Sequence, residues 1–272
     1  MKGKIMTMQP GESRPIQIYA LGRFEIVLAG TPLRFVSKAP RKVLAVLKSL
    51  LCAGARGMSL SVLQDVLWPE SDSLLARRAL GTSVYRLRRL LGCKEAILLS
   101  EGCIVLSPAV CWVDAWAFEQ GLSQPLDVAG LQSILQLYGG MLLNGADHPL
   151  VYPSRERLRR KFIQGVLHLG QAYERNDEIS SAIALYENAL DTDCTPEDVH
   201  RALMRCFARE GKAAAVGAAY QRCRATLWRH FATSPSSATE QVYRAALNPL
   251  AGSITGAISA ARNRQRNDCE RH

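Results

Sequence analysis

The feature that most restricts the fold is an internal repetition in the second half of the chain, which matches itself at an offset of 34 residues. Apolar, aromatic or small side chains recur at corresponding positions: Leu169 and Leu203, Tyr173 and Phe207, Ile179 and Ala213, Ala182 and Val216, Tyr186 and Tyr220. A repeat of this length is typical of antiparallel helix pairs, which bury their apolar faces only by stacking on their neighbours. The second half is therefore predicted to be a helical array.

These helix pairs have the period of tetratricopeptide units. The segment "AIALYENAL" at 182–190 matches the second helix of such a unit, whereas the other copy is degenerate. With flanking helices around 113–138 and 239–247, the repeats are predicted to form one domain over residues 113–247. The polar and basic residues 248–272 are expected to be a flexible tail.

The first half follows a different pattern. Apolar side chains alternate between residues 16 and 28, which predicts short strands, and "AGTP" at 29–32 predicts a hairpin turn. Three helical segments follow, the last running from Ala76 to Leu91, and "AILLSEGCIVLS" at 96–107 predicts a second hairpin. This order predicts a winged helix-turn-helix domain over residues 16–112, after a flexible leader at 1–15. The whole chain is expected to be mainly α with small β elements.

The third helical segment has two contrasting faces. Leu80, Val84, Leu87 and Leu91 form an apolar stripe at helical spacing, while the opposite face is polar. The segment carries five arginines and, between Ala76 and Leu91, no aspartate or glutamate. Like charges on successive helical turns repel one another, and no carboxylate within the segment offsets this repulsion. A polyanion outside the chain is therefore the expected partner of this face. A merely solvated basic face is the alternative interpretation.

The net charge of +10 is concentrated in the predicted winged helix. Residues 1–112 contain 16 lysines and arginines against 7 acidic residues, whereas residues 113–247 contain 14 against 15. This asymmetry favours nucleic acid over an anionic membrane surface as the partner of the first domain. No stretch approaches the ~18 apolar residues of a membrane span, and the N-terminus lacks the apolar region of a secretory signal. We therefore expect a cytoplasmic, nucleoid-associated protein without a membrane partner.

The sequence offers no candidate catalytic, cofactor or metal site. The eight cysteines include no CxxC pair and show no ligand spacing with the five histidines. No nucleophile–base pair, glycine-rich phosphate loop or carboxylate pair can be identified either. The chain is therefore predicted not to be an enzyme, and most of its thiols are expected to be buried in a reducing compartment.

Seven segments together resemble one family. They are "LGRFEI" at 21–26, "APRKVLAVLKSLL" at 39–51, "LQDVLWPE" at 63–70, "SVYRLRRLLG" at 83–92, "VDAWAFEQ" at 113–120, "LYGGMLL" at 137–143 and "RERLRRKF" at 155–162. In their order and spacing the chain resembles the SARP (antibiotic regulatory protein) family of bacterial transcriptional activators. The resemblance implies an OmpR-type winged helix joined to a bacterial transcriptional activator domain. It also implies binding to repeated promoter sites, contact with RNA polymerase and no catalytic residues.

The chain departs from the family pattern in two places. Relatives often carry Asn and Gln where this chain has Arg78 and Gly81, and arginine at a base-reading position favours guanine. The tip of the predicted wing, "SEGC" at 100–103, is acidic rather than basic. The third helix and the start of the first are therefore expected to supply most of the affinity for DNA.

The predicted DNA contacts lie on the third helix, or near the start of the first helix, where the backbone N–H groups favour a phosphate. They are Lys38, Arg41, Lys42, Arg77, Arg78, Thr82, Tyr85, Arg86, Arg88 and Arg89. Arg88 is equally suited to packing its stem over leucine side chains. The segment "RERLRRKF" is interpreted as an ion-pair face between helices rather than as a DNA contact.

The expected function is sequence-specific binding of double-stranded promoter DNA, with activation through RNA polymerase and a second protomer as a partner on repeated sites. Two alternatives stay open. A winged helix that no longer binds DNA would leave a protein–protein adaptor, and the acidic wing is the argument for it. A ligand-gated regulator would instead bind a small molecule in the helical domain near Tyr173, Tyr186 and Tyr220.

Overall fold

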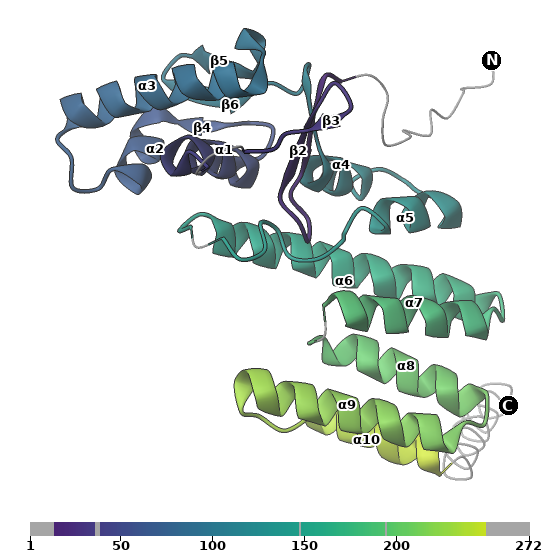
Figure 1. The fold of residues 1–272 in the computed structure, drawn as a ribbon. Coiled ribbons are helices and arrows are strands. Elements are labelled where there is room, and N and C mark those ends of the chain that lie inside the picture. Colours follow the sequence, from purple (N-terminus) through teal and green to yellow (C-terminus); the bar gives the residue numbers. More distant parts are fainter. Residues whose placement is uncertain (1–13, 36–38, 147, 194, 249–272) are drawn as a thin grey trace, which may run out of the picture. The chain divides into compact units, whose positions relative to one another are not determined.

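The computed structural model describes residues 14–35, 39–146, 148–193 and 195–248 (Figure 1). By its contacts the chain divides into two compact units, Met1–Phe162 and Ile163–His272, and the division falls within helix α6 (Val151–Arg175). The domain boundary predicted after Trp112 stays a prediction, because a division by contacts need not coincide with a division into domains.

A four-stranded sheet begins the first unit, in the order β3-β2-β1-β7. Its strands are β1 (Ile16–Tyr19), β2 (Glu25–Leu28), β3 (Thr31–Pro32) and β7 (Cys111–Val113). The predicted turn is confirmed: Ala29 and Gly30 join β2 to β3 with positive φ angles of 45° and 81°, as a two-residue hairpin favours. Strand β7 pairs parallel to β1, with Cys111 opposite Ile16, a pairing that no local pattern indicated.

Three helices and a second sheet follow, and they confirm the predicted winged helix. The helices are α1 (Arg41–Ala53), α2 (Leu60–Leu67) and α3 (Ser73–Leu91). The second sheet has the order β4-β6-β5, built from β4 (Met58–Ser59), β5 (Ile97–Ser100) and β6 (Cys103–Leu106), with the short helix η1 (Lys94–Ala96) before β5. Because β4 lies between α1 and α2 and pairs with β6, the hairpin is fastened to the helices.

A buried carboxylate joins the ends of β1 and β7, which are neighbouring strands of the first sheet. Asp114, the first residue of α4 (Asp114–Gly121), is only 3% exposed. Its two oxygens accept hydrogen bonds from the backbone N–H groups of Ala20, Leu21 and Ala115, at 2.7–3.0 Å. Burial raises the pKa of this carboxyl to about 6, while the backbone hydrogen bonds act in the opposite direction. Asp114 therefore fixes α4, and the chain that continues to α5 (Val128–Leu135), to the end of β1.

The second unit is the predicted helical repeat. Its described residues form the end of α6 and four further helices, α7 (Ile179–Thr192), α8 (Glu197–Arg209), α9 (Ala213–Phe231) and α10 (Ser237–Leu247). Figure 1 shows α7, α8 and α9 stacked in sequence order. Helices α7 and α9 begin 34 residues apart, and each is preceded by a residue with positive φ, Asp177 and Gly211. The residues paired by the repeat are buried, apart from Ile179 and Ala213 at the helix starts, so the tetratricopeptide-like architecture is confirmed.

One substitution explains why the second copy is degenerate. In the first copy Gly170 leaves space for the ring of Tyr186, which is fully buried and donates its hydroxyl to Glu174 at 2.8 Å. Met204 occupies the position equivalent to Gly170 and is itself fully buried. The ring of Tyr220 instead stacks on Tyr243 of α10, with ring centroids 4.0 Å apart, and its hydroxyl donates to Glu240. Helix α10 thus packs against the aromatic side chain that the second copy cannot enclose.

We expect Gly170→Ala to lower the free energy of unfolding by about 3 kcal/mol, the upper range for overpacking a core. A Cβ at this position would lie 2.1–2.4 Å from atoms of the Tyr186 ring and hydroxyl. Gly217→Ala in α9 is the matched control, because a Cβ there meets nothing within 4 Å. It should stabilise the protein by up to about 1 kcal/mol through helix propensity. Denaturant unfolding followed by far-UV circular dichroism measures the free energy of unfolding of both variants. Equal changes in Gly170→Ala and Gly217→Ala would contradict the packing argument.

Candidate nucleic-acid interface

Helix α3 is held by its ends and by one buried face. The Asp72 carboxylate caps its start by accepting the N–H of Leu75 at 2.8 Å, so that the helix begins three residues before the predicted start. Gly92 ends the helix with a φ of 66°, in the left-handed region. The predicted apolar stripe is buried, together with Ala76 and Ser83. The remaining face of α3 is therefore fixed in orientation and points away from the core.

The outward face of α3 is basic and lacks internal partners. The exposed residues on it are Arg77, Arg78, Thr82, Tyr85, Arg86 and Arg89. Tyr85 is 61% exposed, and the Thr82 hydroxyl donates to the carbonyl of Arg78 within the helix at 3.0 Å. Among the ion pairs of the described residues, none involves an arginine of this face. Four guanidinium groups are thus available to an external anion.

The arginines of α6 are placed differently. Arg157 and Lys161 both pair with Glu119 of α4, at 3.1 Å and 2.7 Å. Arg155 donates to the carbonyls of Leu142 and Leu143 at 2.7 Å and 2.6 Å. The interpretation of "RERLRRKF" as an ion-pair face is therefore confirmed. The arginines on the outward face of α3 therefore differ from these basic side chains of α6, which have internal partners.

Arg88 is turned toward the hairpin. Its Nε and Nη2 both donate to the carbonyl of Ile97, at 3.1 Å and 2.6 Å, and the side chain is half-buried. This bidentate contact ties the end of α3 to the start of β5. Its predicted phosphate contact stays a prediction, and its observed role is to position the helix.

The three DNA contacts predicted near the start of α1 differ in how the structure places them. Arg41 is the first residue of α1 and is exposed, while Lys38 lies outside the described residues. The Lys42 ammonium donates to the carbonyl of Leu67 at 2.5 Å and lies 5.4 Å from the centre of the Trp68 ring. Lys42 thus caps the end of α2, where a cation is favoured by the helix dipole, and keeps further N–H donors for a phosphate.

Gly81 lies in the middle of the exposed face of α3, where glycine costs about 1 kcal/mol relative to alanine. A Cβ at this position would meet nothing within 4 Å. Packing within the described residues therefore does not require glycine. The absence of a side chain leaves room for close approach of an external group between Arg78 and Tyr85.

The hairpin β5–β6 matches the prediction of an acidic wing. Glu101 and Gly102 form its turn with φ angles of 49° and 77°, and no basic residue occurs between 97 and 106. Leu98 and Leu99 are exposed on β5, a feature that the sequence pattern did not predict. The cationic surface of the winged helix therefore lies on α3 rather than on the wing.

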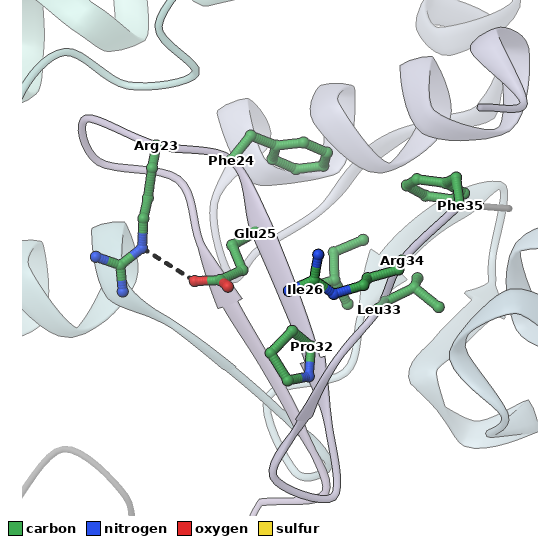
Figure 2. Close-up of a pocket in the computed structure, with 8 residues that line it drawn as sticks. All are labelled: Arg23, Phe24, Glu25, Ile26, Pro32, Leu33, Arg34 and Phe35. Carbon is green, nitrogen blue, oxygen red and sulfur yellow. Dashed lines mark ion pairs between the residues drawn. The ribbon is translucent and has the colours of Figure 1, made fainter. Parts of the chain in front are cut away.

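The first unit also contains a pocket of about 400 Å³ beside β2 and β3 (Figure 2). Its lining comes from residues 23–26 and 32–35, and Figure 2 shows the Phe24 and Phe35 rings at its rim. The one carboxylate of the lining, Glu25, pairs with Arg23 at 3.2 Å. The lining offers apolar contact and the Arg34 guanidinium, but no nucleophile–base pair for catalysis.

The tyrosines on which the ligand-gated alternative depends belong to the repeat core. Tyr173, Tyr186 and Tyr220 are all buried, and the last two donate their hydroxyls to Glu174 and Glu240. They pack helix against helix, so they no longer argue for a small-molecule site. Among the described residues, no helix combines the length and apolarity of a membrane span, and no group of three or more His, Cys, Asp and Glu side chains is arranged to bind a metal.

Comparison with known proteins adds two findings. Residues 117–247 match the family model of the bacterial transcriptional activator domain. The chain is also similar to the solved structure of Mycobacterium tuberculosis EmbR in complex with a low affinity phosphopeptide, with a TM-score of 0.63 and 20% sequence identity over 90% of this chain and 71% of that one. At this identity the likeness concerns the fold. A search of the curated proteins found no match.

Proposed function

We propose that the chain is a transcriptional regulator of the SARP type, which binds promoter DNA through α3 and activates transcription by contacting RNA polymerase. The observation that carries this proposal is the outward face of α3, where arginines lack internal partners. Phosphate neutralisation by these arginines supplies most of the affinity, and base contacts supply the specificity.

The geometry of α3 fits a major groove. Arg78, Thr82, Tyr85 and Arg89 follow one another at helical spacing over about 16 Å of the helix axis. Arg78 is suited to bidentate contact with guanine, and Gly81 lets the groove wall approach the backbone. We also propose that two protomers occupy repeated sites, and that the protein acts in the cytoplasm on the nucleoid.

Mobility of DNA fragments across a salt series tests this function. A site is first selected from a random DNA library with the full-length chain, and its affinity is then measured at increasing salt. The logarithm of the affinity should fall linearly with the logarithm of salt concentration, with a slope that reports the number of phosphates neutralised. Absence of retardation at low salt would contradict the proposal and favour the adaptor function, for which the acidic wing argues.

A further inference from the structure

Helix α9 exposes two aromatic side chains near its end. Trp228 is 68% exposed and Phe231 is 58% exposed, whereas Tyr173, Tyr186 and Tyr220 of the same unit are buried. Large exposed aromatic side chains on a folded domain mark binding surfaces.

The exposed aromatics lie on an extension that the repeat does not require. Helix α7 ends at Thr192, whose repeat equivalent is Thr226, but α9 continues to Phe231. Within this extension Leu227 is buried, while Trp228 and Phe231 point outward. Five residues have thus been added to α9, and most of their surface is exposed to solvent.

A hollow of about 350 Å³ accompanies the extension. Ala232 ends α9 with a φ of 52°, so the chain turns back and brings Thr233 and Ser234 beside the helix. These two residues enclose the hollow with four residues of α9. The α9 surface is defined here as Gln221, Arg224, Ala225, Trp228, Phe231, Thr233 and Ser234.

The charge around this surface is uncompensated. No aspartate or glutamate occurs between residues 213 and 231. Arg222 pairs with Asp191 at 2.6 Å, but among the described residues no ion pair involves Arg224 or Arg229. Glu240 of α10 accepts the Tyr220 hydroxyl and lies 3.9 Å from Arg244, so it is already engaged.

We propose that the α9 surface docks an acidic segment of RNA polymerase that inserts an apolar side chain beside Trp228. Tryptophan and arginine are among the residue types that are enriched at binding hot spots. Charge complementarity specifies an acidic partner, and an open hollow with an aromatic wall suits a protein side chain better than a phosphate backbone. This inference rests on the proposed function, since it names the surface through which the polymerase is contacted.

The test compares two variants with two matched controls in the full-length chain. Trp228→Ala and Arg224→Glu alter the α9 surface. Tyr152→Ala removes an aromatic side chain that is 61% exposed on α6, and Arg205→Glu reverses an exposed arginine on α8. Binding of purified RNA polymerase holoenzyme is measured without DNA by biolayer interferometry, and binding of the selected site is measured separately by fluorescence anisotropy.

We expect both α9 variants to bind the polymerase at least tenfold more weakly, with the controls and all DNA affinities within twofold of the wild-type chain. Unchanged circular dichroism and melting temperature establish that the variants are folded. Wild-type affinity of both α9 variants for the polymerase, or no binding by the wild-type chain itself, would overturn the inference. Self-association that disappears in Trp228→Ala, detected by sedimentation velocity, would also overturn it by making a second copy the occupant. Because polymerase binding is measured without DNA, failure of the wild-type chain to bind DNA would defeat only the proposed function.

Discussion

The double variant Arg78→Ala/Arg89→Ala is expected to bind its selected DNA site about 100-fold more weakly than the wild-type chain, since each arginine contributes roughly 1–3 kcal/mol. The salt slope of the affinity should fall by up to about two, one for each phosphate that is no longer neutralised. Both side chains are exposed on α3 and neither has an ion pair among the described residues, so their removal should leave the fold intact.

The control for this variant is Arg175→Ala/Arg205→Ala, which removes the same charge from exposed positions in the repeat unit. It should change affinity by less than threefold, because neither arginine belongs to α3, the helix proposed to bind DNA. Equal reductions of DNA affinity in the two double variants would show that binding depends only on the net charge of the protein. Arg78→Gln then tests base recognition separately from electrostatic attraction. The DNA site selected by this variant should have adenine in place of guanine at one position.

The variant Asp114→Ala is expected to lower the free energy of unfolding of the first unit by about 3–5 kcal/mol, because the backbone N–H groups of Ala20, Leu21 and Ala115 lose their acceptor inside the protein. Asp127→Ala is the matched control, since the Asp127 carboxylate also accepts a backbone N–H, that of Gly130 in α5, but is exposed, and its loss should cost about 1 kcal/mol. Unfolding is followed by tryptophan fluorescence in a Trp228→Phe background. The signal then reports on the first unit, because it contains the remaining tryptophans, Trp68, Trp112 and Trp116.

The effect of Asp114→Ala should also depend on pH. The native pKa of about 6 exceeds the ordinary value of 3.8, so the folded state binds the proton more tightly than the unfolded state. This carboxyl therefore stabilises the fold increasingly as pH falls from 7 toward 4, by up to about 3 kcal/mol. The difference in stability between wild type and variant should be larger at pH 5 than at pH 7.5. A difference that does not change with pH would contradict the raised pKa.

Much of the winged helix and of the repeat could be predicted from local patterns. The stripe of Leu80, Val84, Leu87 and Leu91 is buried as its spacing indicates, and the arginines on the opposite side of α3 are exposed. Glycine, aspartate and proline at the ends of elements are also local signals, although the cap at Asp72 moved the start of α3 by one turn.

The partners of individual polar side chains could not be predicted in the same way. Arg88 and Arg89 are neighbours with the same chemistry, yet only Arg88 binds the carbonyl of Ile97. Lys42 caps α2, 25 residues along the chain, and Asp114 accepts hydrogen bonds 94 residues away. The extension of α9 could not be predicted either, because Trp228 and Phe231 have the composition of core residues and only the packing shows that they are exposed.

By itself the sequence determined which faces of each helix and strand are apolar. Side chains point to the same face at a fixed spacing in a helix or a strand, so the apolar face can be identified from consecutive residues. It also determined where positive charge accumulates. Only the tertiary structure decided which cations remain available, because a hydrogen bond or an ion pair depends on residues brought together from distant parts of the chain. In this protein the tertiary contacts leave α3 and α9 with guanidinium groups that form no ion pair with a described carboxylate.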